Sequence, residues 1–175
     1  MICKKEHQHR TIIKKTDNIR QQIGNYDNNR TTWVMVDTKY LKQHVYDVVG
    51  AIYEVHRELG AGLNEFCYQE GLEIELCNRS IDFHREPSFH PLYNGKEMKA
   101  IYRLDFICKD DIVVECKSVT ALTPDHRAQL FNYMRLTDSM CGILVNFKPK
   151  YAVVERYFYD SNTQEILSVD GVPII

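Results

Sequence analysis

The sequence of 175 residues lacks any apolar run close to the roughly 20 residues of a membrane-spanning helix. Its first ten residues, MICKKEHQHR, are polar and lack the apolar stretch of a secretion signal. An excess of basic residues is also missing, because the formal net charge is -2. We therefore expect a cytoplasmic protein with no membrane partner, in which contact with nucleic acid depends on a local cluster of Lys and Arg.

The cysteines include no CxxC pair and form no tight framework of the kind found in disulfide-rich secreted domains. The usual close pair of zinc ligands is missing as well, which disfavours a structural zinc site. We expect reduced thiols, several of them in the core. The six cysteines are Cys3, Cys67, Cys77, Cys108, Cys116 and Cys141.

The length suits one domain with its own hydrophobic core and is short for two domains. Residues 1–33 differ from the rest, with seven Lys or Arg against three acidic residues and few large apolar side chains. We predict a polar, basic and flexible extension over residues 1–33 and a single domain over residues 34–175. Two other interpretations of the extension stay open: a basic arm that touches nucleic acid, and a true translation start at Met35.

Apolar residues that recur every three or four positions predict three helices. The first covers residues 37–59. The second covers residues 64–77, with Asn64 as its N-cap. The third covers residues 124–137 and begins at Pro124, a residue that suits the first turn of a helix.

Period-two patterns and turn residues predict the strands between and after these helices. The predicted strands cover residues 81–85, 89–93, 98–108, 112–118, 141–147 and 151–159, the last as an edge strand. Asn94–Gly95 and residues 109–111 are predicted as the turns of two hairpins. The order is helix, helix, antiparallel strands, helix, strand, strand. It predicts an α/β (mixed α+β) fold with a central mixed sheet flanked by helices.

The hairpin that turns at Asp110 carries the strongest functional signal. Asp105 and Glu115 are equidistant from Asp110, so they lie opposite each other on one sheet face with Cβ atoms about 5 Å apart. Lys117 follows two residues after Glu115 and shares that face. Two such carboxylates repel each other unless a cation lies between them, and Mg²⁺ prefers oxygen ligands. We predict a magnesium site; the alternative is a plain cross-strand salt bridge with Lys117.

Polar residues on two helices can complete this site. Glu65 lies in the first turn of its helix, either as a third carboxylate at the metal or as a charge that complements the helix dipole. Gln129 and Tyr133 lie one turn apart on one helix face. They either bond the site and the substrate or form the edge of an ordinary amphipathic helix.

Two basic residues are candidates for contact with phosphate. Arg103 lies two residues before Asp105 and is predicted on the same strand face. Its alternative role is a salt bridge to Glu65 or Glu115. His126 lies three residues before Gln129 on one helix face and is a candidate for contact with the site or the nucleic-acid backbone.

The segment Gly60-x-Gly62-Leu63-x-Glu65-x-x-Tyr68 resembles the signature of the GxxExxY proteins, small bacterial members of the PD-(D/E)XK nuclease superfamily. The likeness covers about residues 40–160. Further matching segments are VHREL at 55–59, RLDF at 103–106, VECK at 114–117, Q-x-x-x-Y at 129–133 and NF at 146–147. One departure is that Leu104 stands where the superfamily name has Pro.

The resemblance implies a restriction-endonuclease-like αβββαβ core with a metal-dependent nuclease site. The implied ligands of Mg²⁺, for which Mn²⁺ can substitute, are Asp105, Glu115, the backbone carbonyl of Cys116 and the accessory carboxylate of Glu65. Lys117 would position water or stabilise charge. Gln129 and Tyr133 match a motif of the exonuclease-like branches.

The residues and the resemblance together predict a metal-dependent nuclease, a hydrolase that cleaves phosphodiester bonds, with DNA favoured over RNA. Two alternatives stay open. One is a catalytically silent module that binds nucleic acid or protein on the same fold, and the other is a subunit of a mobile-element or defence assembly. Cleavage of both strands of a duplex would need two sites, which favours a homodimer or a partner protein.

Overall fold

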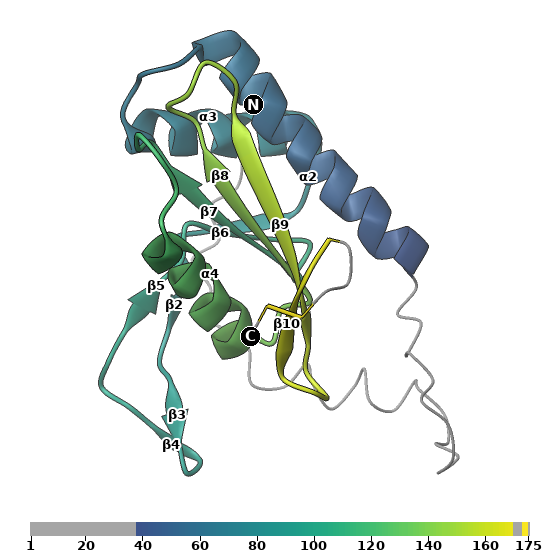
Figure 1. Ribbon diagram of the computed structural model, residues 1–175, viewed down its shortest axis with the longest axis vertical. Helices are drawn as coiled ribbons and strands as arrows, with labels where there is room; N and C mark the ends of the chain where they lie inside the picture. Colours follow the sequence, from purple (N-terminus) through teal and green to yellow (C-terminus); the bar gives the residue numbers. More distant parts are fainter. Residues whose placement is uncertain (1–37, 170–172, 175) are drawn as a thin grey trace. The chain divides into compact units, whose positions relative to one another are not determined.

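Two helices at the start of the described chain confirm the predicted periodicity. In this computed structural model, which describes residues 38–169 and 173–174, α2 covers Thr38–Leu59 and α3 covers Glu65–Asn78 (Figure 1). Asn64 is the N-cap of α3, as predicted, and its side chain accepts a backbone hydrogen bond from the first turn. Gly60 has a φ of +70°, a value that suits glycine at a helix end. The predicted extension over residues 1–33 and Met35 lie outside the described residues.

A six-stranded mixed sheet forms the centre of the fold (Figure 1), with the strand order β1-β6-β7-β8-β9-β10. β7 and β8 run parallel, and every other neighbouring pair is antiparallel. The strands of this sheet are β1 (Phe83–Arg85), β6 (Phe106–Cys108), β7 (Ile112–Lys117), β8 (Cys141–Asn146), β9 (Val153–Asp160) and β10 (Glu165–Ser168). The predicted fold class, a mixed sheet flanked by helices, is confirmed.

The helix α4 (Pro124–Thr137) makes the crossover between the parallel strands β7 and β8. It begins at Pro124, as predicted, and Thr123 caps it. Helices α2 and α3 pack on one face of the sheet and α4 packs on the other (Figure 1). The side chains of β7 and β8 are therefore buried on both faces, which explains why these strands read as near-continuous apolar runs.

The predicted strand over residues 98–108 is wrong, because the chain divides there into β5 (Tyr102–Arg103) and β6. β5 pairs with β2 (Ser88–Phe89) in a separate two-stranded ladder. The partner chain breaks at the same level, since Pro87 has no N–H to continue the sheet. The Pro87 carbonyl still accepts from Leu104 N–H over 3.1 Å, so the two chains stay paired across the break.

Beyond this break a hairpin extends from the main sheet, as Figure 1 shows. It consists of β3 (Leu92–Tyr93) and β4 (Lys96–Glu97). Asn94 and Gly95 join the two strands with φ values of +49° and +73°, so the predicted turn is confirmed.

The prediction of residues 151–159 as the edge strand is also wrong. β9 lies between β8 and β10, and β10 forms that edge of the sheet. The turn into β10 is stabilised by Asp160, whose carboxylate accepts the backbone N–H of Asn162 over 2.8 Å. In the part of the chain that the structure describes, no helix is long and apolar enough to cross a membrane.

Candidate active site

The hairpin of β6 and β7 has the register that the sequence predicts. Phe106 pairs with Val114, and Cys108 pairs with Ile112, so the pairing is symmetric about Asp110. Continued by one step, this register places Asp105 opposite Glu115. Val114 and Cys116 point to the opposite face and join the core against α2 and α3. The carboxylate face is therefore the face that α4 covers.

Asp105 lies at the bend that precedes β6, where its side chain is held across the hairpin. Its Oδ2 accepts a 2.7 Å hydrogen bond from the backbone N–H of Cys116. Burial raises the pKa of the Asp105 carboxyl, although this N–H, Lys117 and a hydrogen bond from Gln69 oppose the rise. The backbone of β7 thus fixes the orientation of the Asp105 carboxyl group, whose burial disfavours the ionised form.

Glu115 is the most deeply buried charged residue of this face, with 2% of its surface exposed. Burial, with a further contribution from the charge of Asp105, raises the pKa of Glu115 to about 7. Its Oε1 accepts from Lys117 Nζ over 2.6 Å. Its Oε2 is buried and has no hydrogen-bond partner. One oxygen of this carboxylate is therefore available for another ligand, and a buried oxygen without a partner is costly.

Lys117 supplies the positive charge of the site. Burial disfavours its ammonium form, but the carboxylates of Glu115, Glu65 and Asp105 outweigh burial and raise the pKa of Lys117. Its side chain is only 12% exposed. A salt bridge, the alternative to the magnesium site, forms between Lys117 and Glu115 within β7 and not across strands. It uses only one of the two carboxylate oxygens.

Glu65 approaches this face from the N-terminus of α3. It is partly buried, and its charge raises the pKa of both Asp105 and Glu115, so it lies within electrostatic reach of the hairpin carboxylates. The buried Tyr68 explains its placement. Tyr68 Oη donates to the Gly60 carbonyl over 2.7 Å and accepts from Leu63 N–H over 3.1 Å. The glycine motif is therefore folded back onto α3 by its own tyrosine.

The same turn is also attached to the end of β7. Ser118 Oγ donates to the Leu63 carbonyl over 2.6 Å. Asn146, at the end of β8, accepts from Val119 N–H over 3.1 Å and donates to the Val119 carbonyl over 2.7 Å. These bonds connect the ends of β7 and β8 to the turn that positions Glu65.

Gln129 and Tyr133 lie on α4, as predicted, and contact each other. Gln129 Nε2 donates to Tyr133 Oη over 2.9 Å. Burial raises the pKa of the Tyr133 phenol, and the negative charges of Glu115 and Asp105 add to the rise. The phenol therefore lies within the electrostatic reach of the carboxylate face.

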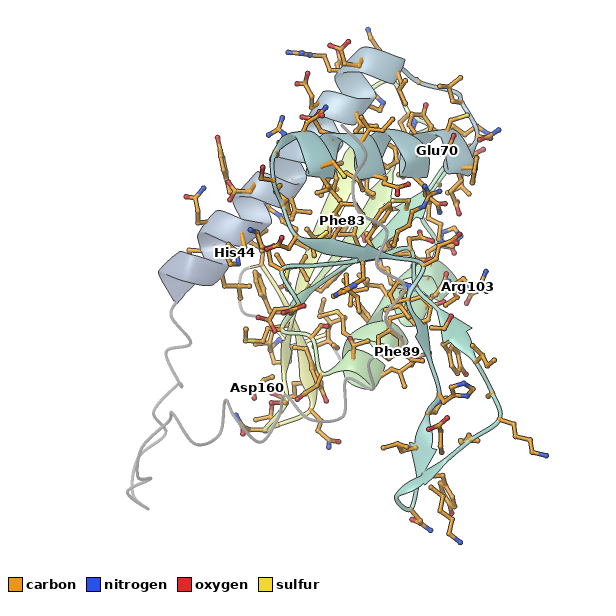
Figure 2. All side chains as sticks on the ribbon, turned by 180° about the vertical axis from the view of Figure 1, so that it is seen from behind. His44, Glu70, Phe83, Phe89, Arg103 and Asp160 are labelled. Atoms are coloured by element: carbon orange, nitrogen blue, oxygen red, sulfur yellow. The ribbon has the colours of Figure 1, made fainter. Side chains whose placement is uncertain are left out.

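Arg103 and His126, the two candidates for phosphate contact, lie on β5 and in the first turn of α4. Arg103 is exposed on β5, and Figure 2 labels it near the start of the projecting hairpin. The strand on which Arg103 and Asp105 were predicted together is interrupted between them, because β5 ends at Arg103 and β6 begins at Phe106. His126 takes part in the capping of α4, where its Nδ1 accepts from Thr123 N–H over 3.1 Å. Their roles in substrate binding stay predictions.

Gln69 is a residue of the site that the sequence reasoning missed. It is buried on α3, one turn after Glu65, and its side chain bonds Asp105. The spacing of four residues between Glu65 and Gln69 was the available signal, because such residues share one helix face.

The donor set fits a hard divalent cation, although no group of three His, Cys, Asp or Glu side chains in the described chain is arranged as a metal site. The observation that carries the fit is the buried Oε2 of Glu115, which has no partner. Mg²⁺ is usually held by one or two carboxylates, with waters and substrate phosphate completing its shell. Asp105 and Glu115 meet that requirement.

The protein is an α/β protein with a mixed sheet between helices. Two carboxylates and a lysine lie on the hairpin of β6 and β7, on the face that the crossover helix α4 covers. A family model described as the PD-(D/E)XK nuclease superfamily matches residues 42–157. The chain belongs to the PD-(D/E)XK nuclease superfamily, and its mixed sheet flanked by helices is consistent with that membership.

Two further comparisons add little to this assignment. Among solved structures, the chain is similar to one described as the crystal structure of SSO0001, with 20% sequence identity and a TM-score of 0.44. The similarity covers 85% of this chain and 77% of that chain. No curated protein matches the sequence.

Proposed function

We propose that this protein is a metal-dependent nuclease that hydrolyses phosphodiester bonds in nucleic acid, with DNA favoured over RNA. The observation that carries the proposal is the pair of carboxylates on β6 and β7, with an unpaired buried oxygen on Glu115 and an ammonium group beside it. Membership in the nuclease superfamily supports the same chemistry. We place the protein in the GxxExxY group of that superfamily on the segment from Gly60 to Tyr68.

The residues divide into metal ligands and groups that act on water and phosphate. Asp105 and Glu115 would hold Mg²⁺ or Mn²⁺, with the backbone carbonyl of Cys116 and the accessory carboxylate of Glu65 nearby. A divalent cation at this position would lower the pKa of bound water and stabilise charge on phosphorus. The cation also explains the arrangement of acidic groups, since it replaces their mutual repulsion with attraction.

Lys117 has the position and charge to assist hydrolysis directly. Its pKa is raised, so it stays protonated throughout the physiological range. A fixed ammonium group beside the reacting phosphate can hold a water molecule by hydrogen bonding and oppose the negative charge that develops. Hydrolysis then adds water across one P–O bond and leaves a phosphate on one fragment and a hydroxyl on the other.

The test uses purified full chain with Mg²⁺ or Mn²⁺ and a panel of labelled single-stranded, duplex and branched DNA and RNA. We expect cleavage by the wild type and a loss of at least a hundredfold in Glu115→Gln and Asp105→Asn, which keep the size of each side chain. The matched control is Glu58→Gln on the exposed end of α2, which should cleave like the wild type. Equal cleavage by the wild type and Glu115→Gln would show that cleavage does not depend on Glu115 and does not take place at this site.

The ion pair between Lys117 and Glu115 favours a second candidate, a module that binds nucleic acid or a partner protein without cleaving it. In that case Lys117 and Glu115 form a structural ion pair, and no metal cation binds at Glu115. Calorimetric titration distinguishes the two candidates, because the nuclease binds Mg²⁺ or Mn²⁺ in a manner that Glu115→Gln abolishes. A homodimer or a partner protein stays a prediction for either candidate.

A further inference from the structure

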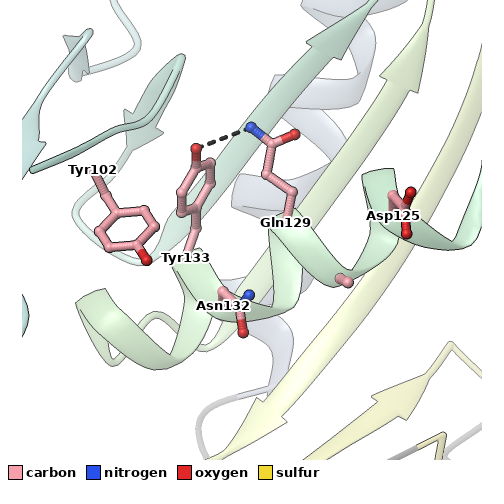
Figure 3. Close-up of a pocket in the computed structure, with 6 residues that line it drawn as sticks. Tyr102, Asp125, Gln129, Asn132 and Tyr133 are labelled. Atoms are coloured by element: carbon pink, nitrogen blue, oxygen red, sulfur yellow. Dashed lines mark hydrogen bonds between the residues drawn. The ribbon is translucent and has the colours of Figure 1, made fainter. Parts of the chain in front are cut away.

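A pocket of about 390 Å³ lies between α4 and Tyr102 of β5 (Figure 3). Its lining includes Tyr133, which lies within electrostatic reach of the carboxylate face. One wall is a stripe of α4 with the helical spacing of three and four residues. The other wall is the ring of Tyr102, the first residue of β5. The six lining residues are Tyr102, Asp125, Ala128, Gln129, Asn132 and Tyr133.

The chemistry of the lining argues against phosphate as the occupant. None of the six lining residues carries a positive charge, and Asp125 carries a negative one. A phosphate group in this pocket would be repelled by Asp125 and would have no cation to replace its water. The part of a nucleic acid that suits the pocket is therefore uncharged.

The same lining has the two kinds of group that bind a nucleobase. Tyr102 is 43% exposed, and its ring is inclined by 76° to that of Tyr133, so the two rings do not stack on each other. An exposed aromatic ring is a stacking surface for a base. The side-chain amides of Gln129 and Asn132 offer donors and acceptors that match the polar edges of bases.

The pocket is linked to the carboxylate face on both of its walls. Tyr102 lies three residues before Asp105, so their Cα atoms are at most about 11 Å apart. On the other wall, Gln129 Nε2 donates to Tyr133 Oη, and Tyr133 packs in the core cluster that contains Val113 of β7. A nucleotide bound in the pocket would therefore be a close neighbour of the phosphate at Asp105.

We propose that this pocket takes one unpaired nucleobase of the strand whose phosphate lies at the carboxylate face. A base inside a regular duplex cannot enter a pocket between a helix and a strand, because it is stacked and paired. The substrate class is therefore nucleic acid with an unpaired nucleotide at the cleavage position: a single strand, a flap or an extruded base. This inference rests on the proposed nuclease function, since it assigns a substrate class to the same site.

Binding measurements test the pocket separately from cleavage. Fluorescence anisotropy of the full chain is measured with a labelled single-stranded DNA oligonucleotide, its RNA counterpart and its blunt duplex, with Ca²⁺ in place of Mg²⁺. We expect Tyr102→Ala to weaken single-strand binding about tenfold and to leave duplex binding unchanged. Asn132→Ala should act in the same direction. Tyr46→Ala is the matched control, because Tyr46 is 75% exposed on α2, on the other side of the sheet.

A second series moves one abasic residue along the single strand. At one position the abasic residue should weaken wild-type binding about as much as Tyr102→Ala does, and the two changes together should add little. Two results would contradict base binding in the pocket and would leave the nuclease proposal standing. One is an equal effect of Tyr102→Ala on single-strand and duplex binding, and the other is no effect at any abasic position. Base-dependent binding without cleavage in Mg²⁺ or Mn²⁺ would support the pocket and contradict the nuclease. A wild type that binds no oligonucleotide would overturn both.

Discussion

Lys117 Nζ donates a 2.6 Å hydrogen bond to Oε1 of Glu115, while Oε2 of the same buried carboxylate has no partner. A simple salt bridge between a lysine and a buried glutamate would be expected to satisfy both oxygens. The asymmetry is explained if the second oxygen serves as a ligand for a divalent cation.

Glu115 should make the metal-free protein less stable as the pH rises. Its pKa in the folded protein is about 7, above the usual 4.5, so the folded state holds this proton more tightly than the unfolded state. The stabilisation is fully present below pH 4.5 and is lost as the pH rises through 7, a change of about 3 kcal/mol. Urea unfolding in EDTA across this range measures it.

Comparison of the wild type with Glu115→Gln separates the titration of Glu115 from that of every other ionisable group. Glutamine has no proton to lose, so the variant should gain up to about 3 kcal/mol relative to the wild type between pH 4.5 and 8. Saturating Mg²⁺ should restore much of the wild-type stability at pH 8 and should not change the variant. Parallel pH curves for the two proteins would contradict the raised pKa.

Lys117→Met should separate metal binding from cleavage. The substitution removes the ammonium group that stabilises developing charge, and we expect cleavage to fall by at least a hundredfold. Metal binding at pH 8 should be retained, because a positive charge that opposes the cation has been removed. Calorimetry and a cleavage assay measure the two effects, with Lys42→Met on the exposed side of α2 as the control. Loss of metal binding in Lys117→Met would contradict this division of roles.

Tyr68→Phe should loosen the turn that positions Glu65. The variant loses the bonds to the Gly60 carbonyl and the Leu63 N–H, and we expect the free energy of unfolding to fall by about 1–2 kcal/mol. Cleavage should fall as well, since the accessory carboxylate is no longer held. Urea unfolding and the cleavage assay measure both, and exposed Tyr46→Phe should match the wild type. A fully stable and active Tyr68→Phe would show that the phenol does not position the turn.

Gly142→Ala should disturb the packing of α4 against β8. A Cβ at this position would lie 2.3 Å from Met134 Sδ and 3.1 Å from Leu130 Cδ2, so the helix would have to shift. We expect a loss of about 1–3 kcal/mol in thermal or urea unfolding. Gly50→Ala in α2 is the control, because its Cβ would meet only the end of the Arg79 side chain at 3.1 Å. That change should be neutral or stabilising by up to about 1 kcal/mol, and an equal loss in both variants would contradict the packing argument.

The central hairpin was predictable because its register depends on local information. The turn at Asp110 and the alternation on either side of it fix which residues lie opposite each other, so Asp105 and Glu115 were paired correctly. The N-cap of α3 was predictable for the same reason, since Asn64 and the first turn of its helix are neighbours in sequence.

The features that the sequence did not predict depend on contacts between distant segments. The break between β5 and β6 lies opposite Glu86 and Pro87, where Glu86 has a φ of +51° and Pro87 has no N–H. Gln69 reaches Asp105 only because α3 lies beside the hairpin, and the pocket combines Tyr102 with residues of α4. The short β10 adds to the sheet through pairing with β9, and its four residues carry too little periodicity to be recognised alone.

The most direct measurement is the rate of Mg²⁺- or Mn²⁺-dependent cleavage by the wild type and Glu115→Gln, purified in parallel and assayed on the same labelled single-stranded and flapped DNA. The account predicts cleavage by the wild type that stops on addition of EDTA and is at least a hundredfold slower in Glu115→Gln. Cleavage at equal rates by both proteins, or none by a wild type that is folded and supplied with either metal, would contradict it.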